Sequence, residues 1–305
     1  MAPHITEIIQ QVWQIDSGES GPVVTILGGV HGSEKAGVHV VRNLLRSDLA
    51  ALVRKGRLNL GIGNPCAVEL CERFVKGDYD LNRVFGLLPP GVEQTIAAAR
   101  GQLLKPIIAA SDLLIDIHAT IKPSEPMLLS PNLLDDPLMQ KIVPVLGIQK
   151  VITGKGMYAE NGNGATTDCY AHSQGRVGIT LETGWQEDMT LVPRVQQSIL
   201  RALSVIGLGP PMNEAIEPME IEAYDAYWSV TASSSFSFTQ EWANFATLPA
   251  GTHFATRDGV ELVTPCDSLM IFQKSKERIV PGTEACLLLR DPQAESDRSR
   301  SRPRR

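Results

Sequence analysis

Hydrophobic residues in the first part of the chain change from strand-like to helix-like spacing. Residues 23–27 are apolar and mostly β-branched, and Gly28 and Gly29 follow, which predicts a strand entering a glycine turn. Apolar residues then recur at helical spacing to about residue 50, with Ser33 as the expected N-cap. A second strand is expected over 57–62. Strand, helix and strand in this order predict a βαβ unit.

The same alternation continues to about residue 206. Helices are expected near 92–110, 133–146 and 191–206, and strands at 113–118, 150–153 and 177–181. This alternation predicts an α/β fold. After Gly209–Pro211 helical periodicity fades and short extended runs remain. Three parts are therefore expected: an α/β domain over 1–211, a smaller β-rich domain over 212–290 and a disordered, arginine-rich tail over 291–305.

Composition and charge exclude several classes of protein. The 305 residues are 43% hydrophobic, but no apolar run approaches the roughly 18 residues of a membrane helix. A net charge of −6 disfavours binding to nucleic acid. The five cysteines include no CxxC pair, which argues against a disulfide framework and a thiolate zinc site. No basic stretch precedes an apolar one at the N-terminus, so a cytoplasmic location is expected.

Two polar motifs lie at the ends of predicted strands and together form a candidate metal site. His31 and Glu34 follow the glycine turn, and their three-residue separation brings both side chains to one side. In the strand at 113–118, alternation places Asp116 and His118 on the same face. A hydrogen-bonded core histidine would also explain His118. With His31 and Glu34, however, it completes the three-ligand set of many catalytic zinc sites.

Other polar residues could contact a substrate. Arg73, Asn82 and Arg83 offer donors suited to an anion, although the Asn-Arg pair would also be ordinary in a loop. Glu182 follows the strand at 177–181, where it could exchange a proton with a substrate or could simply mark the exit of the strand into solvent. The histidines interpreted as structural or surface residues are His4, His39 and His253. The role of His172 is left open.

The order of five motifs resembles the succinylglutamate desuccinylase and aspartoacylase family, which is related to the zinc carboxypeptidases. The motifs are HGSE, GNPCAVELCERF, DLNRVF, DIHAT and LETG, and the resemblance covers most of residues 23–185. The resemblance implies a mixed sheet flanked by helices, as in zinc carboxypeptidases, with a smaller C-terminal β-rich domain. The segments GTHFATRDG and PGTEACLLL resemble that C-terminal domain less sharply.

The resemblance also implies a role for each matching residue. One Zn²⁺ per chain would be held by His31, Glu34 and His118, and Glu182 would be the general base and acid. Arg73 would polarise the scissile carbonyl, while Asn82 and Arg83 would bind the carboxylate of the amino-acid half.

One departure from the family pattern concerns specificity. Where aspartoacylases carry a Tyr and an Arg upstream of the catalytic Glu, this chain has Asp168 and His172. This difference argues against N-acetylaspartate as the substrate and leaves the hydrolytic residues unaffected.

The expected function is zinc-dependent hydrolysis of the amide bond of a small N-acyl amino acid, with N-succinylglutamate-like diacids as first candidates. Two alternatives stay open at this point. One is a zinc carboxypeptidase acting on small peptides, and the other is a noncatalytic binding module on the same fold. No nucleic-acid or membrane partner is expected, and the sequence leaves open whether the chain forms a homodimer.

Overall fold

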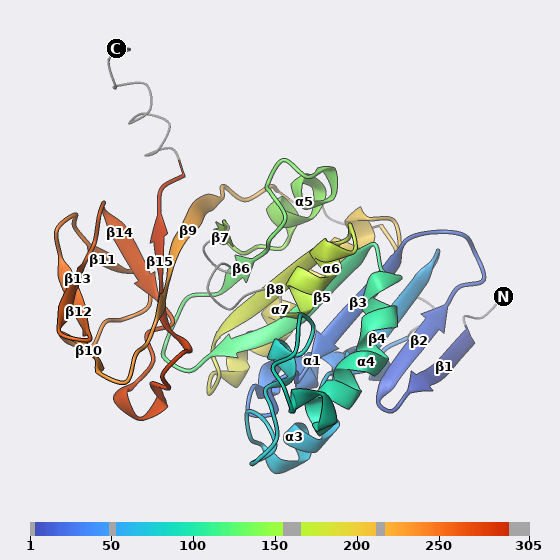
Figure 1. Ribbon diagram of the computed structural model, residues 1–305. Helices are drawn as coiled ribbons and strands as arrows, with labels where there is room; N and C mark the ends of the chain where they lie inside the picture. Colours follow the sequence, from blue (N-terminus) through green and yellow to red (C-terminus); the bar gives the residue numbers. More distant parts are fainter. Residues whose placement is uncertain (1–3, 49–52, 155–165, 212–216, 293–305) are drawn as a thin grey trace, which may run out of the picture.

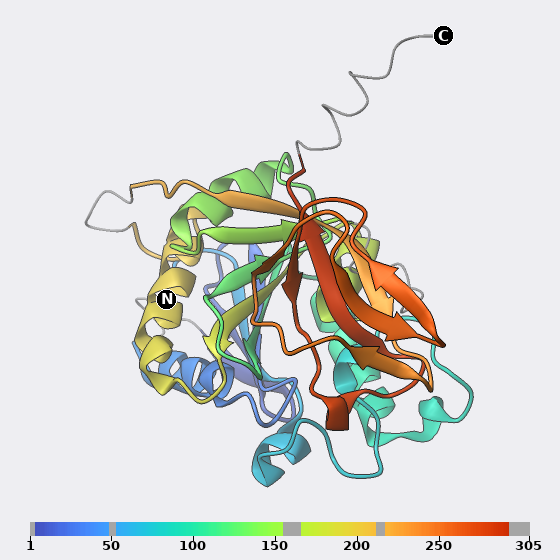
Figure 2. The same ribbon diagram turned by 90° about the vertical axis from the view of Figure 1, so that its left-hand side faces the viewer.

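The computed structural model of the protein describes residues 4–48, 53–154, 166–211 and 217–292. Within these residues, twelve strands form one mixed sheet with helices on both of its faces (Figure 1). A β-rich C-terminal part follows, and the view in Figure 2 looks onto it. The predicted fold class is therefore confirmed.

The strand order of the large sheet is β1-β2-β4-β3-β5-β8-β6-β7-β9-β15-β14-β11. The strands are β1 (His4–Ile9), β2 (Val12–Asp16), β3 (Val23–Gly28), β4 (Arg57–Ile62), β5 (Leu113–Thr120), β6 (Met127–Leu129), β7 (Lys150–Thr153), β8 (Val177–Trp185), β9 (Glu222–Thr231), β11 (Ala246–Leu248), β14 (Ser268–Ile271) and β15 (Glu284–Arg290). A second sheet contains β10 (Phe236–Phe238), β12 (His253–Arg257) and β13 (Val260–Val263).

The helices cover the large sheet from two sides. They are α1 (Lys35–Arg46), α3 (Pro65–Leu70), α4 (Ile96–Ala109), α5 (Pro137–Ile142), α6 (Thr167–Ser173) and α7 (Val192–Val205). Apolar residues of α1, α5 and α7 share one core cluster, and those of α4 and α6 share another. In the described ranges, short 3₁₀ helices join these elements: η1 (Leu81–Arg83), η2 (Val92–Gln94), η3 (Val143–Val145), η5 (Met189–Leu191) and η6 (Lys276–Arg278).

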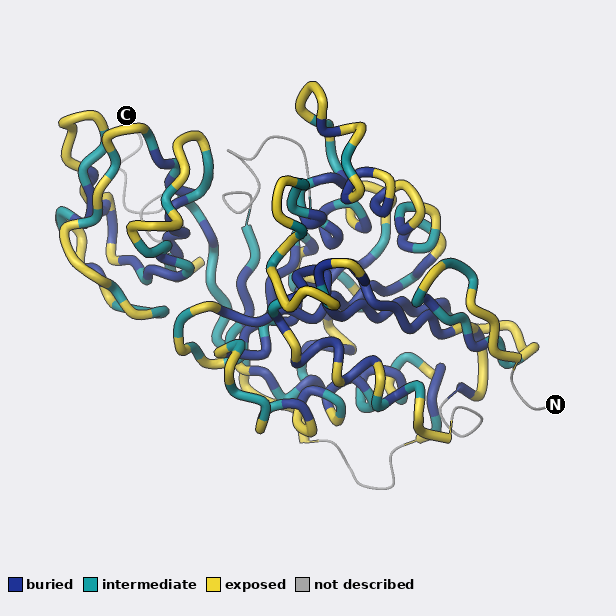
Figure 3. Tube along the Cα trace, turned by 90° about the horizontal axis from the view of Figure 1, so that it is seen from below, coloured by how far each residue is buried: buried dark blue, intermediate teal, exposed yellow. Residues whose placement is uncertain are grey.

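Strand β5 runs through the middle of the sheet and is buried along its whole length (Figure 3). Ile115 and Ile117 belong to the core on the α1 side, whereas Leu114 belongs to the core on the α4 side. Because side chains alternate along a strand, Asp116 and His118 lie on the α4 side. The parallel neighbours β3 and β8 end beside β5, and His118 pairs with Glu182.

Helix α1 packs directly on the strands that carry the predicted site. A Cβ atom added to Gly28 of β3 would lie 2.3 Å from the backbone of Gly37 in α1, and one added to Gly37 would lie 2.9 Å from the carbonyl oxygen of Ile117. Only glycine at both positions allows the backbones to approach this closely. The contact fixes the start of α1, and with it Glu34, against β3 and β5.

Several local predictions need correction. Helix α1 has Glu34 rather than Ser33 as its N-cap, and Glu34 makes no side-chain capping bond because its carboxylate contacts two histidines instead. The helix expected over 133–146 is shorter, since Asp136 caps a new helix start at Pro137. The strand expected over 177–181 continues to Trp185, which places Glu182 inside β8.

The β-rich part is joined to the α/β part through one shared strand. Residues Glu222–Asp225 of β9 pair with β7, and residues 225–231 of the same strand pair with β15. The predicted domain boundary adjoins residues 212–216, which lie outside the described part of the chain, as do residues 293–305 of the predicted tail. Among the described residues, no helix is both long enough and apolar enough to cross a membrane.

Candidate metal centre

His31, Glu34 and His118 meet at the carboxyl ends of β3 and β5. His31 lies in the turn after β3, and the Glu34 N–H donates to the His31 carbonyl, so a backbone turn rather than a helical face brings the two side chains together. His31 Nδ1 lies 2.8 Å from Glu34 Oε1, and His118 Nδ1 lies 3.0 Å from Glu34 Oε2. All three residues are at most 4% exposed.

The arrangement of these donor atoms fits one metal ion. The Nδ1 atoms of His31 and His118 are 3.1 Å apart and both face Glu34. Ligands held about 2.0–2.1 Å from a tetrahedral zinc ion are about 3.3 Å from one another. Two imidazole nitrogens and one carboxylate oxygen at this separation are a donor set suited to zinc. The predicted convergence of the three residues is thus present in the structure.

Each histidine also contacts an outer carboxylate through its other ring nitrogen. His118 Nε2 lies 2.9 Å from Asp116 Oδ2, and His31 Nε2 lies 3.1 Å from Asp80 Oδ1. A carboxylate at Nε2 favours the tautomer that carries its proton there, which leaves the Nδ1 lone pair for an ion. Burial lowers the pKa of His118, but the charges of Asp116 and Glu34 outweigh burial and raise it well above the usual value.

Asp80 links the histidine to an arginine. Its Oδ2 accepts hydrogen bonds from Arg73 Nε at 3.3 Å and Nη2 at 3.1 Å, and Arg73 Nη1 lies 3.6 Å from Glu34. Burial raises the pKa of Asp80, but the charges of His31 and Arg73 lower it by more. The pKa of this carboxyl group therefore lies well below its ordinary value. Sequence reasoning did not assign this aspartate a role, although it opens the DLNRVF motif.

Glu182 lies on β8 directly beside His118. Its Oε2 is buried and has no hydrogen-bond partner among the described residues. Burial raises the pKa of Glu182 to about 7, with Glu34 adding to this effect and the charges of His118, His31 and Arg73 opposing it. The alternative that Glu182 merely marks an exit into solvent does not fit this burial. A carboxyl group with such a pKa can both take up and release a proton near neutral pH.

Asn82 and Arg83 follow Asp80 in η1. Asn82 Oδ1 accepts a hydrogen bond of 3.1 Å from the backbone N–H of Thr167 in α6, which leaves the NH₂ group of the amide as its donor end. Arg83 Nη1 donates to the Asn82 carbonyl at 2.7 Å. Thr167 also donates its hydroxyl to Asp116, so it connects Asn82 to the partner of His118.

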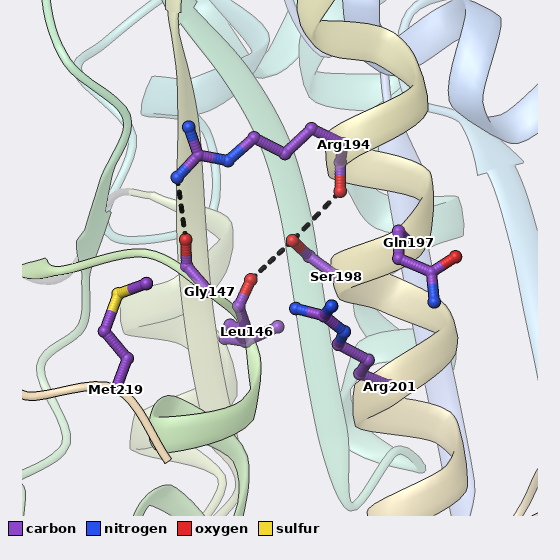
Figure 4. A pocket seen from close by; sticks show the side chains of 7 residues that line it. All are labelled: Leu146, Gly147, Arg194, Gln197, Ser198, Arg201 and Met219. Atoms are coloured by element: carbon purple, nitrogen blue, oxygen red, sulfur yellow. Dashed lines mark hydrogen bonds between the residues drawn. The ribbon is translucent and has the colours of Figure 1, made fainter. Parts of the chain in front are cut away.

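The other residues considered from the sequence lie elsewhere or are held locally. His4, His39 and His172 are exposed, and His253 is half-buried in β12. Asp168 is buried in the first turn of α6 and accepts a hydrogen bond from Thr166. A separate pocket lies between Leu146, Gly147, Met219 and helix α7 (Figure 4). None of the predicted site residues lines that pocket.

Comparison with known proteins gives one family. The profile described as "Succinylglutamate desuccinylase/Aspartoacylase catalytic domain" matches residues 20–205. Mouse aspartoacylase is 35% identical over 109 residues, which are 32% of this chain and 34% of that protein. The succinylglutamate desuccinylase of Burkholderia pseudomallei is 38% identical over 87 residues, 28% of this chain and 23% of that protein. These alignments thus span about a third or less of either relative.

A solved structure shows the same fold over nearly the whole chain. Succinylglutamate desuccinylase from Vibrio cholerae superposes with a TM-score of 0.77 and 18% identity, covering 95% of this chain and 91% of that one. The similarity therefore includes the β-rich C-terminal part as well as the residues matched by the profile.

Proposed function

Because this chain belongs to the succinylglutamate desuccinylase/aspartoacylase family, we propose that it hydrolyses the amide bond of an N-acyl amino acid. The observation that carries the proposal is the convergence of two buried imidazoles and a carboxylate, each imidazole backed by an outer aspartate, beside Glu182, whose Oε2 is buried and has no hydrogen-bond partner among the described residues. Such a group of residues suits metal-assisted hydrolysis.

His31, Glu34 and His118 would hold a zinc ion. When bound, the ion would supply Lewis-acid polarisation of the scissile carbonyl group. Asp116 and Asp80 would keep the two imidazoles in the orientation and tautomer that ligation needs, since each aspartate already contacts an Nε2 atom. The cytoplasmic location expected from the sequence stays a prediction.

Glu182 would move the proton during hydrolysis. Its unpartnered Oε2 would accept a proton from the attacking water as the water oxygen forms a bond to the carbonyl carbon. Glu182 would then pass this proton to the nitrogen of the leaving amino acid as the amide C–N bond breaks. Its pKa of about 7 suits both halves of this transfer.

Arg73 and the pair formed by Asn82 and Arg83 would act on the substrate. Arg73 donates hydrogen bonds to Asp80 through Nε and Nη2. Its Nη1, which lies 3.6 Å from Glu34 and beyond hydrogen-bond distance, would therefore donate to the negative charge that develops on the carbonyl oxygen. Asn82 has its donor end free of the Thr167 contact, and Arg83 adds a positive charge, which together suit the α-carboxylate of the amino-acid half.

The test is a hydrolysis panel of N-succinyl, N-acetyl and N-formyl amino acids and short peptides, measured with and without a chelator. We expect release of the amino acid from N-acyl substrates, loss of turnover with chelator and recovery after zinc is restored. Turnover of peptides alone would refute the deacylase proposal.

Two variants test the assigned roles. Glu182→Gln should lower kcat at least about 100-fold while the zinc content stays unchanged, because it removes the proton acceptor and no ligand. His31→Gln should lose zinc, whereas His39→Gln is the matched control because His39 is an exposed histidine on α1. Normal turnover by the Glu182 variant would remove this residue from the mechanism.

A further inference from the structure

The pocket beside helix α7 lies on the other face of the large sheet from the candidate metal centre. Leu146 at its wall belongs to the same core cluster as Ile115 and Ile117 of β5, whereas Asp116 and His118 lie on the opposite, α4 side. The pocket has a volume of about 300 Å³, which is the lower end of the range of small-molecule sites. Its position makes it independent of the residues assigned to hydrolysis.

Two arginines extend from α7 toward one glycine at the wall of this pocket (Figure 4). Arg194 and Arg201 are seven residues apart, and this separation of about two helical turns places them on the same face of α7. Arg194 Nη2 donates to the Gly147 carbonyl at 2.9 Å. A Cβ atom added to Gly147 would lie 3.2 Å from Arg201 Nη1, so the second guanidinium group lies against the same residue. Two positive charges therefore converge at Gly147.

The backbone after η3 leaves room for these side chains and is tied to α7. Gly147 has a φ of 71°, a backbone conformation that favours glycine, and it leaves open the space beside Arg201 that a side chain would fill. The Ser198 hydroxyl, between the two arginines on α7, donates to the Leu146 carbonyl. This hydrogen bond fixes the turn at Gly147 against the helix, so the two guanidinium groups are held at one place.

Neither arginine has a negative partner in the described ranges, where no carboxylate oxygen lies within 4.0 Å of either guanidinium group. Met219 lines the pocket from the side away from α7, while its acidic neighbours Glu217 and Glu220 are exposed and do not line it. Arg201 is half-buried, which reduces the screening of its charge by solvent. Like charges brought together in this way repel, and an anion between them removes the repulsion.

We propose that this pocket binds a small phosphate monoester, with the phosphate group between Arg194 and Arg201. Such a group carries a charge of about −1.5 to −2 at pH 7 and three acceptor oxygens, so two guanidinium groups can contact it from different sides. A single carboxylate has one charge and matches one guanidinium fork. The organic part of the ligand packs against Leu146 and Met219, the apolar walls of the pocket.

The experiment is isothermal titration calorimetry of the full chain, supplied with zinc, at constant ionic strength. The probes are glycerol phosphate, acetate and glycerol. We expect saturable binding of glycerol phosphate and much weaker or no binding of the other two. Arg194→Gln and Arg201→Gln should each weaken glycerol phosphate binding about 10-fold or more, because each removes a charge-assisted hydrogen bond. Arg201→Lys, which keeps the charge without the planar fork, should retain part of the affinity.

Arg42→Gln is the matched control, because Arg42 is an exposed arginine on α1 that does not line the pocket. It should leave the affinity for glycerol phosphate unchanged, and an equal loss in this variant would show a general charge effect and overturn the assignment. Binding that persists when both Arg194 and Arg201 are changed to Gln would place the phosphate elsewhere, such as at the metal centre, and would also overturn it. So would equal affinity for acetate, or no saturable binding to the wild type. Melting temperatures show whether each variant folds.

Discussion

The contact between Asp116 and His118 gives the sharpest test of the metal centre. Asp116 is fully buried; its Oδ2 accepts hydrogen bonds from His118 Nε2 and the Thr167 hydroxyl, and its Oδ1 has no partner among the described residues. In Asp116→Asn the new NH₂ group must take one of these two positions. It then either faces two donors or lies buried without an acceptor, and the negative charge behind His118 is lost in both cases.

The size of the effect follows from these contacts. Losing an outer carboxylate of this kind lowers metal affinity about 10- to 100-fold, which corresponds to about 1.4–2.7 kcal/mol. A buried, unpaired NH₂ group costs folding stability about 1–3 kcal/mol in addition. We therefore expect weaker zinc binding together with a lower free energy of unfolding.

The assay is a competitive zinc titration of the metal-free protein against a chromophoric chelator, with thermal unfolding in parallel. Asp112→Asn is the control, because Asp112 lies just before the same strand and pairs with Arg176 near the surface. Thr167→Val, which keeps the carboxylate and removes one of its donors, should give a smaller loss of affinity. Unchanged zinc affinity in a correctly folded Asp116→Asn variant would refute the reasoning.

Two further predictions concern helix packing and acid stability. Gly37→Ala places a Cβ 2.9 Å from the Ile117 carbonyl and should cost about 1–3 kcal/mol of stability and weaken zinc binding, because α1 must move with Glu34 at its start; equal melting temperatures and zinc affinities of variant and wild type would contradict this. In the metal-free protein, the lowered pKa of Asp80 stabilises the fold above the ordinary aspartate pKa of about 3.9, and this contribution is lost as the pH falls toward the folded-state pKa. When the pH is lowered from about 5 to 2, the free energy of unfolding should therefore fall less in Asp80→Asn than in the wild type, as measured by urea unfolding. The same pH dependence of the unfolding free energy in both proteins would contradict a lowered pKa of Asp80.

Local patterns predicted the parts of the site that strand and turn geometry determine. Alternation along β5 placed Asp116 and His118 on one face, and the glycine turn after β3 placed His31 and Glu34 beside them. Asp80 was not predicted, because it reaches His31 across 49 residues and from a segment without regular spacing. No periodic signal records a contact of this kind.

Other features depend on pairing between distant segments. The strands β1 and β2 at the edge of the sheet were not predicted, since β2 is fixed by its antiparallel pairing with β4, more than 40 residues later. The position of the loop after β14 depends on the pairing of β14 with β15 and on the contact of Gln273 with Lys122. Its contact with the segment after β5 follows only from the assembled sheet.

The shared strand β9 limits how far the β-rich part can move, and this would restrict the size of the substrate that the proposed deacylase accepts. Its first residues are hydrogen-bonded to β7 and its later ones to β15, so rotating the β-rich part as a rigid body would break ladder hydrogen bonds. The distance between the three candidate metal ligands and the β-rich part is thus fixed by the hydrogen bonds that β9 makes on both sides. Adding or removing one methylene in the amino-acid side chain should change catalytic efficiency abruptly, because the frame cannot yield to accommodate it.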